Sequence, residues 1–279
     1  MISGKTRLVA LIGRPVGHSL SPAMHNASFA AEGLDFVYVA LDVEPEDVPE
    51  AVRGAAALGL RGFNVTMPHK RTVFPLMDEL DESARVSGAV NTVVIEGQRL
   101  SGHNTDGFGL VEACKEAGAG LAGRWVLLLG AGGAAASIAV AFCDEGIEEL
   151  CIVNRSVEHG ERLSRKLRDA GKKTRIEVHP PEFMNEAFSD DPVIVNATPL
   201  GMREDDPLPL PPERLDENTT MVDAVYRPGV ETAVIREARQ RGARVVTGER
   251  MLLYQGVLAQ KLWTGRQPNV RAMASALTR

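Results

Sequence analysis

The sequence predicts an α/β protein of two domains, each with a mostly parallel sheet. Short apolar runs alternate along the chain with stretches whose apolar residues recur at helical spacing, which is the pattern of βαβ units. Residues 1–105 carry one such pattern, and a second begins with a helix, an apolar run at 125–129 and a glycine-rich turn. A chain of 279 residues is long enough to give both domains a core.

Local signals define the elements of the first half. Gly13 ends the first apolar run, and Ser21 is expected to cap a helix that Pro22 opens. Glu96-Gly97-Gln98 lies between two short apolar runs and predicts a hairpin. The expected elements are strands at residues 8–12, 37–41 and 62–66, paired strands at 89–95 and 99–101, and helices at 22–32, 45–58 and 106–118.

The second half continues the alternation, interrupted by one loop. The prolines between residues 199 and 212 exclude both helix and central strand, so this stretch is expected to be irregular. The expected elements are strands at 125–129, 150–153, 175–178, 193–197, 221–224 and 244–247, helices that end near residues 145 and 170, and helices at 230–241, 249–265 and 268–278.

Gly130, Gly132 and Ala135 have the spacing of a dinucleotide-binding loop. In such loops the first glycine makes a tight turn, the second lets the backbone approach a pyrophosphate, and the small third residue lets the helix pack closely. The helix that opens here presents N–H groups and a positive dipole end to the phosphates. The flanking strands favour a Rossmann-type dinucleotide-binding domain over a glycine turn in another kind of α/β domain.

The next strand ends in Asn154-Arg155, with no acidic side chain to accept hydrogen bonds from a free ribose 2′-hydroxyl. A guanidinium suits a 2′-phosphate instead. One charge-assisted hydrogen bond contributes on the order of 1.5–3 kcal/mol, roughly tenfold to a hundredfold in preference. The sequence therefore favours NADP over NAD, and a solvated arginine after a strand is the alternative.

Composition and charge narrow the classes of partner. The formal net charge of -6 is spread along the chain, with no basic block suited to nucleic acid or an anionic membrane surface. No apolar stretch is long enough to span a membrane, so we expect small-molecule partners and a cytoplasmic location. Cys114, Cys143 and Cys151 form no Cys-x-x-Cys pair, and no two histidines have metal-ligand spacing on a helix, so no metal is expected.

Polar clusters lie at expected strand ends and turns, where side chains can reach a cleft. Ser19 and Ser21 can bind a carboxylate, although Ser21 alone is more simply explained as a helix cap. Lys70 is placed by Pro68 at a helix start, where the dipole disfavours a cation. Asp106 could equally be a cap or a functional group. The clusters occupy residues 18–22, 63–70, 88–92 and 102–107.

Eight short motifs follow one another along nearly the whole chain: His-Ser-x-Ser-Pro, Asn-Val-Thr-x-Pro-x-Lys, Gly-Ala-Val-Asn-Thr, Asn-Thr-Asp-Gly, Gly-Ala-Gly-Gly-Ala, Val-Asn-Arg, Asn-Ala-Thr-Pro-Leu-Gly-Met and Met-Leu-x-x-Gln. In this combination and order the sequence strongly resembles the shikimate dehydrogenases. The resemblance implies reversible reduction of 3-dehydroshikimate to shikimate with NADPH, in aromatic amino acid (chorismate) biosynthesis. It implies a substrate-binding catalytic domain at 1–105 plus 248–279, an NADP-binding Rossmann domain at 106–247, and a monomer or homodimer.

The resemblance also assigns site residues. Lys70 and Asp106 match the catalytic pair. The substrate-binding positions are Ser19 and Ser21, expected at the carboxylate, and Thr66, Asn91, Tyr226 and Gln255. The cofactor-binding positions are Gly130, Ala131, Gly132, Gly133 and Ala134 at the pyrophosphate, Asn154 and Arg155 at the adenosine end, and Ala224 and Gly248 at the nicotinamide.

Ketone reduction requires a hydride at carbon and a proton at the nascent alkoxide. Lys70 as an ammonium can stabilise the alkoxide and donate the proton. Asp106 would orient Lys70 and hydrogen-bond a ring hydroxyl. The residues leave open which of the two donates the proton.

One departure from the family pattern concerns the cofactor. NADP-dependent members usually carry a second arginine a few residues after Asn-Arg, and this chain has Glu158-His159 there. The NADP preference is therefore expected to be weaker than usual, although the acidic residue of the NAD-using branch is absent from Val157. One alternative is a dehydrogenase that also accepts quinate and NAD. The other is a sensor without turnover, which the presence of Lys70 and Asp106 disfavours.

Overall fold

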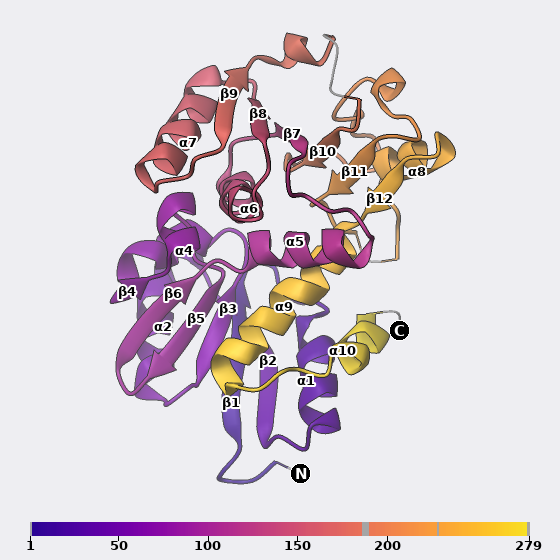
Figure 1. Ribbon diagram of the computed structural model, residues 1–279. Helices are drawn as coiled ribbons and strands as arrows, with labels where there is room; N and C mark the ends of the chain where they lie inside the picture. The colour runs from indigo at the N-terminus through magenta and orange to yellow at the C-terminus, as the bar shows by residue number, and fades with distance from the viewer. Residues whose placement is uncertain (1, 186–189, 228, 278–279) are drawn as a thin grey trace. The chain divides into compact units, whose positions relative to one another are not determined.

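The computed structural model describes residues 2–185, 190–227 and 229–277, and contacts divide the chain into two units (Figure 1). Unit 1 comprises Met1–Thr105 and Gln255–Arg279, and unit 2 comprises Asp106–Tyr254. Each unit has its own six-stranded sheet, so the predicted α/β class with two mostly parallel sheets is confirmed. No helix in the described part of the chain is long and apolar enough to cross a membrane.

The sheet of unit 1 has the strand order β2-β1-β3-β5-β6-β4. β1 pairs in parallel with β2 and β3, and β4 with β6, whereas β5 is antiparallel to both of its neighbours. The predicted hairpin is therefore the pair β5 and β6. The strands are β1 (Arg7–Gly13), β2 (Phe36–Asp42), β3 (Gly62–Val65), β4 (Glu79–Leu80), β5 (Thr92–Glu96) and β6 (Arg99–His103).

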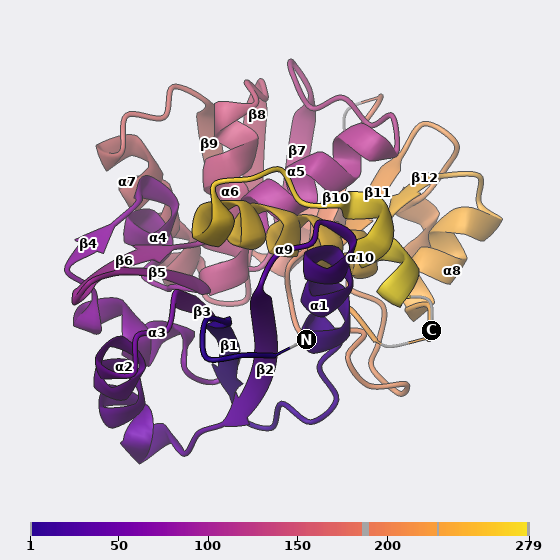
Figure 2. The ribbon, with the colours of Figure 1, turned by 90° about the horizontal axis from the view of Figure 1, so that it is seen from below.

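Helices cover both faces of this sheet. Residues of α2, α3 and α4 pack with Phe63 and Val93 on one face, and Phe29 of α1 packs with Trp263 of α9 on the other. α10 lies beside α1 (Figures 1 and 2). The helical elements are α1 (Ser21–Ala31), η1 (Pro45–Asp47), α2 (Val48–Ala57), α3 (Lys70–Val73), η2 (Phe74–Leu76), α4 (Glu82–Ser87), α10 (Val270–Leu277), and the part of α9 (Gly248–Thr264) from Gln255 on.

Trp263 attaches α9 to the sheet of unit 1. Its side chain is buried, and its indole N–H donates to the carbonyl oxygen of Val93 at 2.9 Å. A Cβ on Gly62 would lie 2.4 Å from the indole nitrogen and 2.2 Å from the Val93 oxygen. Only glycine at position 62 leaves room for this contact.

The sheet of unit 2 is parallel throughout, in the order β12-β11-β10-β7-β8-β9. With β7 counted as the first strand of this unit, the order is the 3-2-1-4-5-6 of the doubly wound nucleotide-binding fold. It reverses between β7 and β10, and ligands of such sheets bind at the carboxyl ends of the strands at this point. The strands are β7 (Trp125–Leu129), β8 (Glu149–Val153), β9 (Arg175–His179), β10 (Val193–Asn196), β11 (Thr220–Asp223) and β12 (Arg244–Val246).

Helices pack closely on this second sheet. α8 and the segment 208–215 bury Ile235 and Leu210 against Leu127 on one face. Gly160 brings α7 so near the other face that a Cβ there would lie 2.5 Å from Val178. The helical elements are α5 (Asp106–Glu116), α6 (Gly133–Asp144), α7 (Val157–Asp169), η3 (Pro181–Asn185), η4 (Pro212–Arg214), α8 (Ala233–Gln240) and the start of α9.

Some local predictions are wrong. Ser21 is not the N-cap of α1. Leu20 holds that position with backbone angles in the helical region, and Ser21 is the first helical residue, whose N–H donates to Ser19 Oγ at 3.2 Å. The helix expected from residue 230 begins at Ala233, because Thr232 has extended backbone angles. β4 and α4 were not expected at all. The last residue of the expected helix 268–278 lies outside the described residues.

Candidate active site

The glycine turn after β7 forms the first part of a dinucleotide site in unit 2. Gly130 has φ +110°, and its N–H donates to the Val153 carbonyl at 2.8 Å. A Cβ on Gly130 would lie 3.0 Å from the carbonyl oxygen of Ala197, whereas a Cβ on Gly132 would meet nothing within 4 Å. The fold itself therefore requires glycine at 130, while Gly132 leaves open space where a ligand can approach the backbone.

The N-terminus of α6 follows directly. Gly132 holds the N-cap position without a side-chain cap, and Gly133 is the first of the 12 residues of the helix. Ala131 and Ala134 are half-buried beside this turn, and Ala135 is buried against the sheet. First-turn N–H groups and the helix dipole suit a pyrophosphate here, so this end of unit 2 fits a dinucleotide.

Asn154 and Arg155 follow β8 at the same edge of the sheet. The Asn154 N–H donates to the His179 carbonyl at 3.2 Å, and its Nδ2 donates to the carbonyl of Ser156 at 2.8 Å, which turns the chain into α7. Arg155 is exposed, and within the described part of the chain no hydrogen bond or ion pair holds its guanidinium. An arginine in this state can bind an incoming phosphate.

Glu158 and His159 lie in the first turn of α7, both exposed. The Ser156 hydroxyl donates to Glu158 Oε2 at 2.8 Å, and this bond together with a backbone hydrogen bond lowers the pKa of the Glu158 carboxyl. A negative charge therefore lies three residues beyond Arg155.

A buried polar network fixes the loops after β10 and β11. Asn196 Nδ2 donates to Asp223 Oδ1 at 2.9 Å and to the Leu200 carbonyl at 3.0 Å, and Asn196 Oδ1 accepts from Thr198 Oγ1 at 2.7 Å. Asp223 also accepts from the Thr232 hydroxyl. Burial raises the pKa of Asp223, and these hydrogen bonds oppose the shift. The motif Asn-Ala-Thr-Pro-Leu-Gly-Met thus shapes the loop beside Gly130.

The expected nicotinamide-end residues lie together in unit 2. The Ala224 N–H donates to the Asn196 carbonyl at 2.9 Å. The Gly248 backbone is so close that a Cβ there would lie 3.0 Å from the Ala224 oxygen and 2.3 Å from that of Val225. The Tyr226 hydroxyl is buried with no hydrogen-bond partner among the described residues, and burial raises its pKa. This orphaned hydroxyl is available to a ligand.

In unit 1 the two serines lie where α1 begins. Ser19 Oγ accepts from the Ser21 N–H at 3.2 Å, and Ser21 is buried. Burial raises the pKa of Tyr38, and a hydrogen bond from the Ser21 side chain opposes this shift. The Tyr38 hydroxyl in turn donates to Asn64 Oδ1 at 2.8 Å. Ser21 is therefore the first member of a buried chain of polar groups.

That chain continues to Asn91 and Gln255, which meet at Thr105. Asn64 Nδ2 donates to Thr92 Oγ1 at 2.9 Å and to the Asn91 carbonyl at 3.1 Å. Asn91 Oδ1 accepts from the Thr105 N–H at 2.9 Å, and Asn91 Nδ2 donates to Thr105 Oγ1 at 3.0 Å. The Thr105 hydroxyl also reaches Gln255 Oε1 at 3.5 Å. Three segments far apart in the sequence thus present amide and hydroxyl groups together.

Thr66 and Lys70 are held by the turn after β3. The Thr66 N–H donates to the Ile12 carbonyl at 2.9 Å, and the Thr66 carbonyl accepts from the His69 N–H at 3.0 Å. Lys70 opens α3, as expected, and its carbonyl accepts from the Val90 N–H at 2.9 Å. Lys70 is half-buried. Asp106, the first residue of α5, is buried and follows Thr105 directly.

Four residues that support these groups had no role assigned from the sequence. Asn64, Thr92 and Thr105 lie within the predicted polar clusters, whereas Tyr38 lies outside them. Asn64 carried a usable signal, because a polar side chain inside a continuously buried strand needs partners. Tyr38 carried none, since an aromatic residue in a strand is ordinary. Among the described residues, the only Cys, His and carboxylate group close enough to share a metal ion is Cys151, Glu177 and His179, on β8 and β9.

The strand order, glycine turn and helix N-terminus define unit 2 as a Rossmann-type dinucleotide-binding unit, which places the chain in the class of two-domain dinucleotide-dependent enzymes. Family models agree: a shikimate dehydrogenase substrate binding domain matches residues 11–93, a shikimate / quinate 5-dehydrogenase model matches 112–200, and a shikimate 5′-dehydrogenase C-terminal domain matches 248–278. The chain belongs to the shikimate/quinate dehydrogenase family.

Individual relatives cover the full length. The shikimate dehydrogenase (NADP(+)) of Rubrobacter xylanophilus is 56% identical over 99% of this chain and 97% of its own. The Thermus thermophilus shikimate 5-dehydrogenase, solved with NADP(H) and shikimate, superposes with a TM-score of 0.85 at 38% identity, over 98% of each chain. The Corynebacterium glutamicum quinate dehydrogenase, solved with NAD, gives 0.88 at 32% identity over 97% of this chain and 98% of its own.

Proposed function

We propose that this chain is an NADP-dependent oxidoreductase that catalyses the reversible reduction of 3-dehydroshikimate to shikimate, in aromatic amino acid biosynthesis. The relative at 56% identity supports this activity. In the structure, the observation that carries it is the buried network in which Asn91, Thr105 and Gln255 meet, directly before Asp106. Amide and hydroxyl groups that lie this close together can form hydrogen bonds with a small ring that bears several hydroxyls.

The substrate residues divide by the group they would bind. Ser19 and Ser21 would donate their hydroxyls to the carboxylate, since they lie together where α1 begins. Asn91 and Gln255 are the amides that would contact the ring hydroxyls. Thr66 and Tyr226 complete the proposed set, and the unpartnered hydroxyl of Tyr226 supports its inclusion.

The geometry of unit 2 supports the proposed cofactor residues. NADPH, when bound, supplies the hydride. Its pyrophosphate would lie against residues 130–134, Asn154 and Arg155 would hold the adenosine end, and Arg155 would read the 2′-phosphate. The Ala224 and Gly248 backbones would border the nicotinamide. Glu158, a carboxylate of lowered pKa in the first turn of α7, opposes a second phosphate contact there.

Lys70 and Asp106 are the proposed catalytic pair. In the reduction, the Lys70 ammonium would stabilise negative charge on the ketone oxygen and donate the proton that it needs. Asp106 would orient Lys70 and accept a hydrogen bond from a ring hydroxyl. In the reverse direction the neutral amine would take the proton back.

The proposal also includes small-molecule partners only, a cytoplasmic location, and a monomer or homodimer. Sedimentation velocity with and without NADP and shikimate would report the oligomeric state.

Initial rates on the purified chain test the activity, with shikimate or quinate and with NADP or NAD in all four combinations. We expect kcat/KM to be dominated by shikimate with NADP. Comparable rates with quinate and NAD would support the second candidate, a dual-specificity dehydrogenase, which is favoured by the likeness to the quinate dehydrogenase and by the charge of Glu158. No turnover in any combination would contradict both and leave a non-catalytic sensor.

A further inference from the structure

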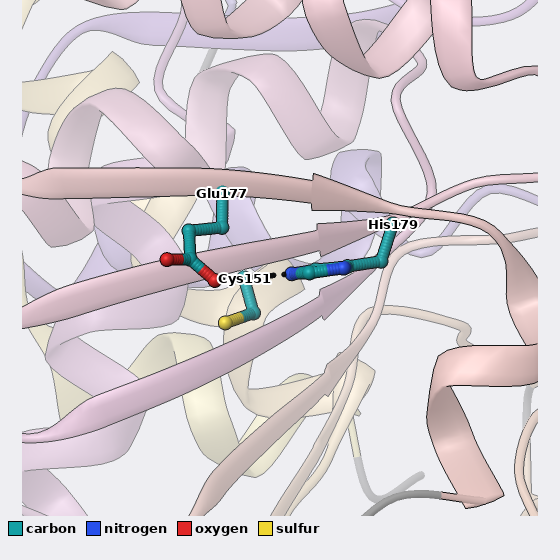
Figure 3. A group of neighbouring side chains, drawn as sticks. All are labelled: Cys151, Glu177 and His179. Carbon is teal, nitrogen blue, oxygen red and sulfur yellow. Dashed lines mark hydrogen bonds and ion pairs between the residues drawn. The ribbon is translucent and has the colours of Figure 1, made fainter.

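Side chains of three metal-binding types gather at the β8–β9 edge of unit 2. Cys151 and Glu177 are paired across the two parallel strands, and His179 is paired with Val153, two residues beyond Cys151. Side chains two residues apart on a strand share a face, so all three project from the same side of the sheet (Figure 3). Glu149, two residues before Cys151, belongs to this face as well.

The distances already approach those of a tetrahedral site. The ligand atoms of Cys151, Glu177 and His179 all lie within 4.8 Å of one another. Glu177 Oε2 and His179 Nε2 are 3.2 Å apart, and Cys151 Sγ is 3.6 Å from Glu149 Oε1. With metal bonds of about 2.0–2.3 Å, two ligands of a tetrahedral zinc ion lie about 3.3–3.8 Å apart. The edge between Glu177 and His179 thus has nearly the right length without a metal.

The electrostatic surroundings favour a cation. Glu149 Oε1 lies 3.6 Å from the Cys151 sulfur, and the carboxylate of Glu177 lies on the same face of the sheet. Their negative charge attracts a divalent ion, whose own charge then favours the thiolate. A hydrogen bond from Trp125 to the Cys151 sulfur would support a bound thiolate.

Access is available from the solvent side. The side chains of Glu177 and His179 are 34% and 26% exposed. Arg175 forms ion pairs with Glu149 and Glu177, but its side chain is 68% exposed and can turn into solvent when a metal takes its place. The His179 ring stacks on Phe183 with 3.8 Å between centroids, which fixes its orientation.

We propose that Cys151, Glu177 and His179 form a Zn²⁺ site at this edge, with a solvent molecule in the fourth position. Thiolate, imidazole and carboxylate are the donors that zinc accepts in a four-coordinate site, and magnesium or calcium would not select a thiolate. Binding breaks the S–H bond of Cys151, forms a Zn–S bond and releases one proton to the solvent, with no change of oxidation state. The site is separate from the residues proposed for catalysis.

Titration calorimetry of the chelator-treated full chain with ZnCl₂ tests the proposal directly. We expect one ion per chain, and a binding enthalpy that varies with the ionisation enthalpy of the buffer because a proton is released. With CoCl₂ as the probe, a thiolate-to-cobalt charge-transfer absorption should appear. Cys151→Ser should abolish this absorption, and His179→Gln and Glu177→Gln should each weaken Zn²⁺ binding roughly 10–100-fold.

Two further variants separate loss of the metal site from loss of folding. Cys143→Ser removes a half-buried thiol elsewhere in unit 2 and should leave binding unchanged. Glu177→Gln alters a partly exposed side chain, so it tests the site even where Cys151→Ser fails to fold. Equal Zn²⁺ affinity in the wild type, His179→Gln and Glu177→Gln would overturn the site, as would several weak ions per chain without proton release. None of these readouts depends on dehydrogenase activity.

Discussion

Lys70 and Arg71 are neighbours in α3, yet Lys70 is half-buried and Arg71 is exposed. We expect Lys70→Ala to lower kcat for shikimate oxidation by roughly 10²–10⁴-fold, because a positioned acid or base contributes about that much. KM for shikimate should change little, since the lost interaction acts mainly in the transition state. Steady-state kinetics measure both constants. Arg71→Ala is the matched control, and a Lys70→Ala enzyme with normal kcat would exclude Lys70 from proton transfer.

Arg155 lies at the end of β8 without a partner within the described segments, unlike the many arginines of this chain that are held in ion pairs. Arg155→Ala should raise KM for NADPH roughly 10–100-fold and leave KM for NADH nearly unchanged, because only NADPH carries the 2′-phosphate. Arg165→Ala, which removes another exposed arginine after this strand, should affect neither constant. Equal losses for the two cofactors would show that Arg155 does not read the phosphate.

Single residues also show what the sequence alone can predict. Lys70 and Gly130 occur where their motifs place them, because each depends on local chain geometry. The contact between Asn91, Thr105 and Gln255 could not be derived from spacing, because it joins a strand start, a helix start and a helix near the other end of the chain. Motif order identified these positions as important. Their common network became visible only with the tertiary structure.

At the scale of elements, two glycines of the turn between β7 and α6 are expected to have different roles, Gly130 in stability and Gly132 in cofactor binding. Gly130→Ala places a side chain at φ +110° and near the Ala197 oxygen, so we expect a loss of about 1–3 kcal/mol in the free energy of unfolding. Gly132→Ala meets no protein atom within 4 Å and should leave stability within about 1 kcal/mol of the wild type. Its Cβ should instead weaken NADPH binding, because it occupies the space beside the helix N-terminus.

Denaturant unfolding and fluorescence titration with NADPH would measure the two effects on the same preparations. If Gly132→Ala bound NADPH as tightly as the wild type, the pyrophosphate could not lie against this turn. If Gly130→Ala kept full stability, the turn would have relaxed away from the left-handed region.

Helices and strands long enough to show a pattern of apolar residues could be predicted from the sequence, whereas very short ones could not. All six strands of unit 2 lie at the expected positions. The four inner strands are buried on both faces and mostly apolar, whereas the edge strand β9 alternates polar and apolar residues. β4 has two residues and α4 has six, too few for a period to appear. The strand order could not be predicted, for another reason. β7 pairs with β10, and no local pattern in either strand indicates this pairing.

At the scale of the whole molecule, His25 couples the stability of unit 1 to pH. It is buried against Tyr38, with ring centroids 4.5 Å apart, and its Nδ1 bonds Gln260 Oε1 at 3.1 Å. Burial lowers the pKa of His25 from 6.5 to about 4, and the Gln260 hydrogen bond only partly opposes this. The neutral ring is therefore favoured in the folded state, so its contribution is complete above pH 6.5 and is lost as pH falls toward 4.

We expect this linkage to reach about 3 kcal/mol below pH 4, since each pKa unit corresponds to about 1.4 kcal/mol. Urea denaturation between pH 4 and 7.5 would measure it as a slope of unfolding free energy against pH. His25→Phe should remove the contribution of His25 to the dependence of unfolding free energy on pH. His18→Gln, which changes an exposed histidine, should leave that contribution in place. An unchanged slope in His25→Phe would assign the acid sensitivity to the carboxylates.

The boundary between the units falls between Tyr254 and Gln255, within the continuous helix α9. No proline, glycine cluster or change in composition marks this point in the sequence. Side chains are buried on both sides of this boundary, Leu253 before it and Val257 and Trp263 after it. The sequence predicts that this helix exists, but it does not predict that the helix is divided between two units.

The position of Trp263 and Gln260 near the end of the chain has a consequence for synthesis on the ribosome. Val9, Phe29 and Tyr38 emerge early, but the side chains that cover them come from α9. All of unit 2 must be translated in between, which takes on the order of ten seconds or more at about 5–20 residues per second. Unit 2 can therefore mature first, while the nascent N-terminal segment keeps an apolar sheet face open to chaperones until α9 leaves the exit tunnel.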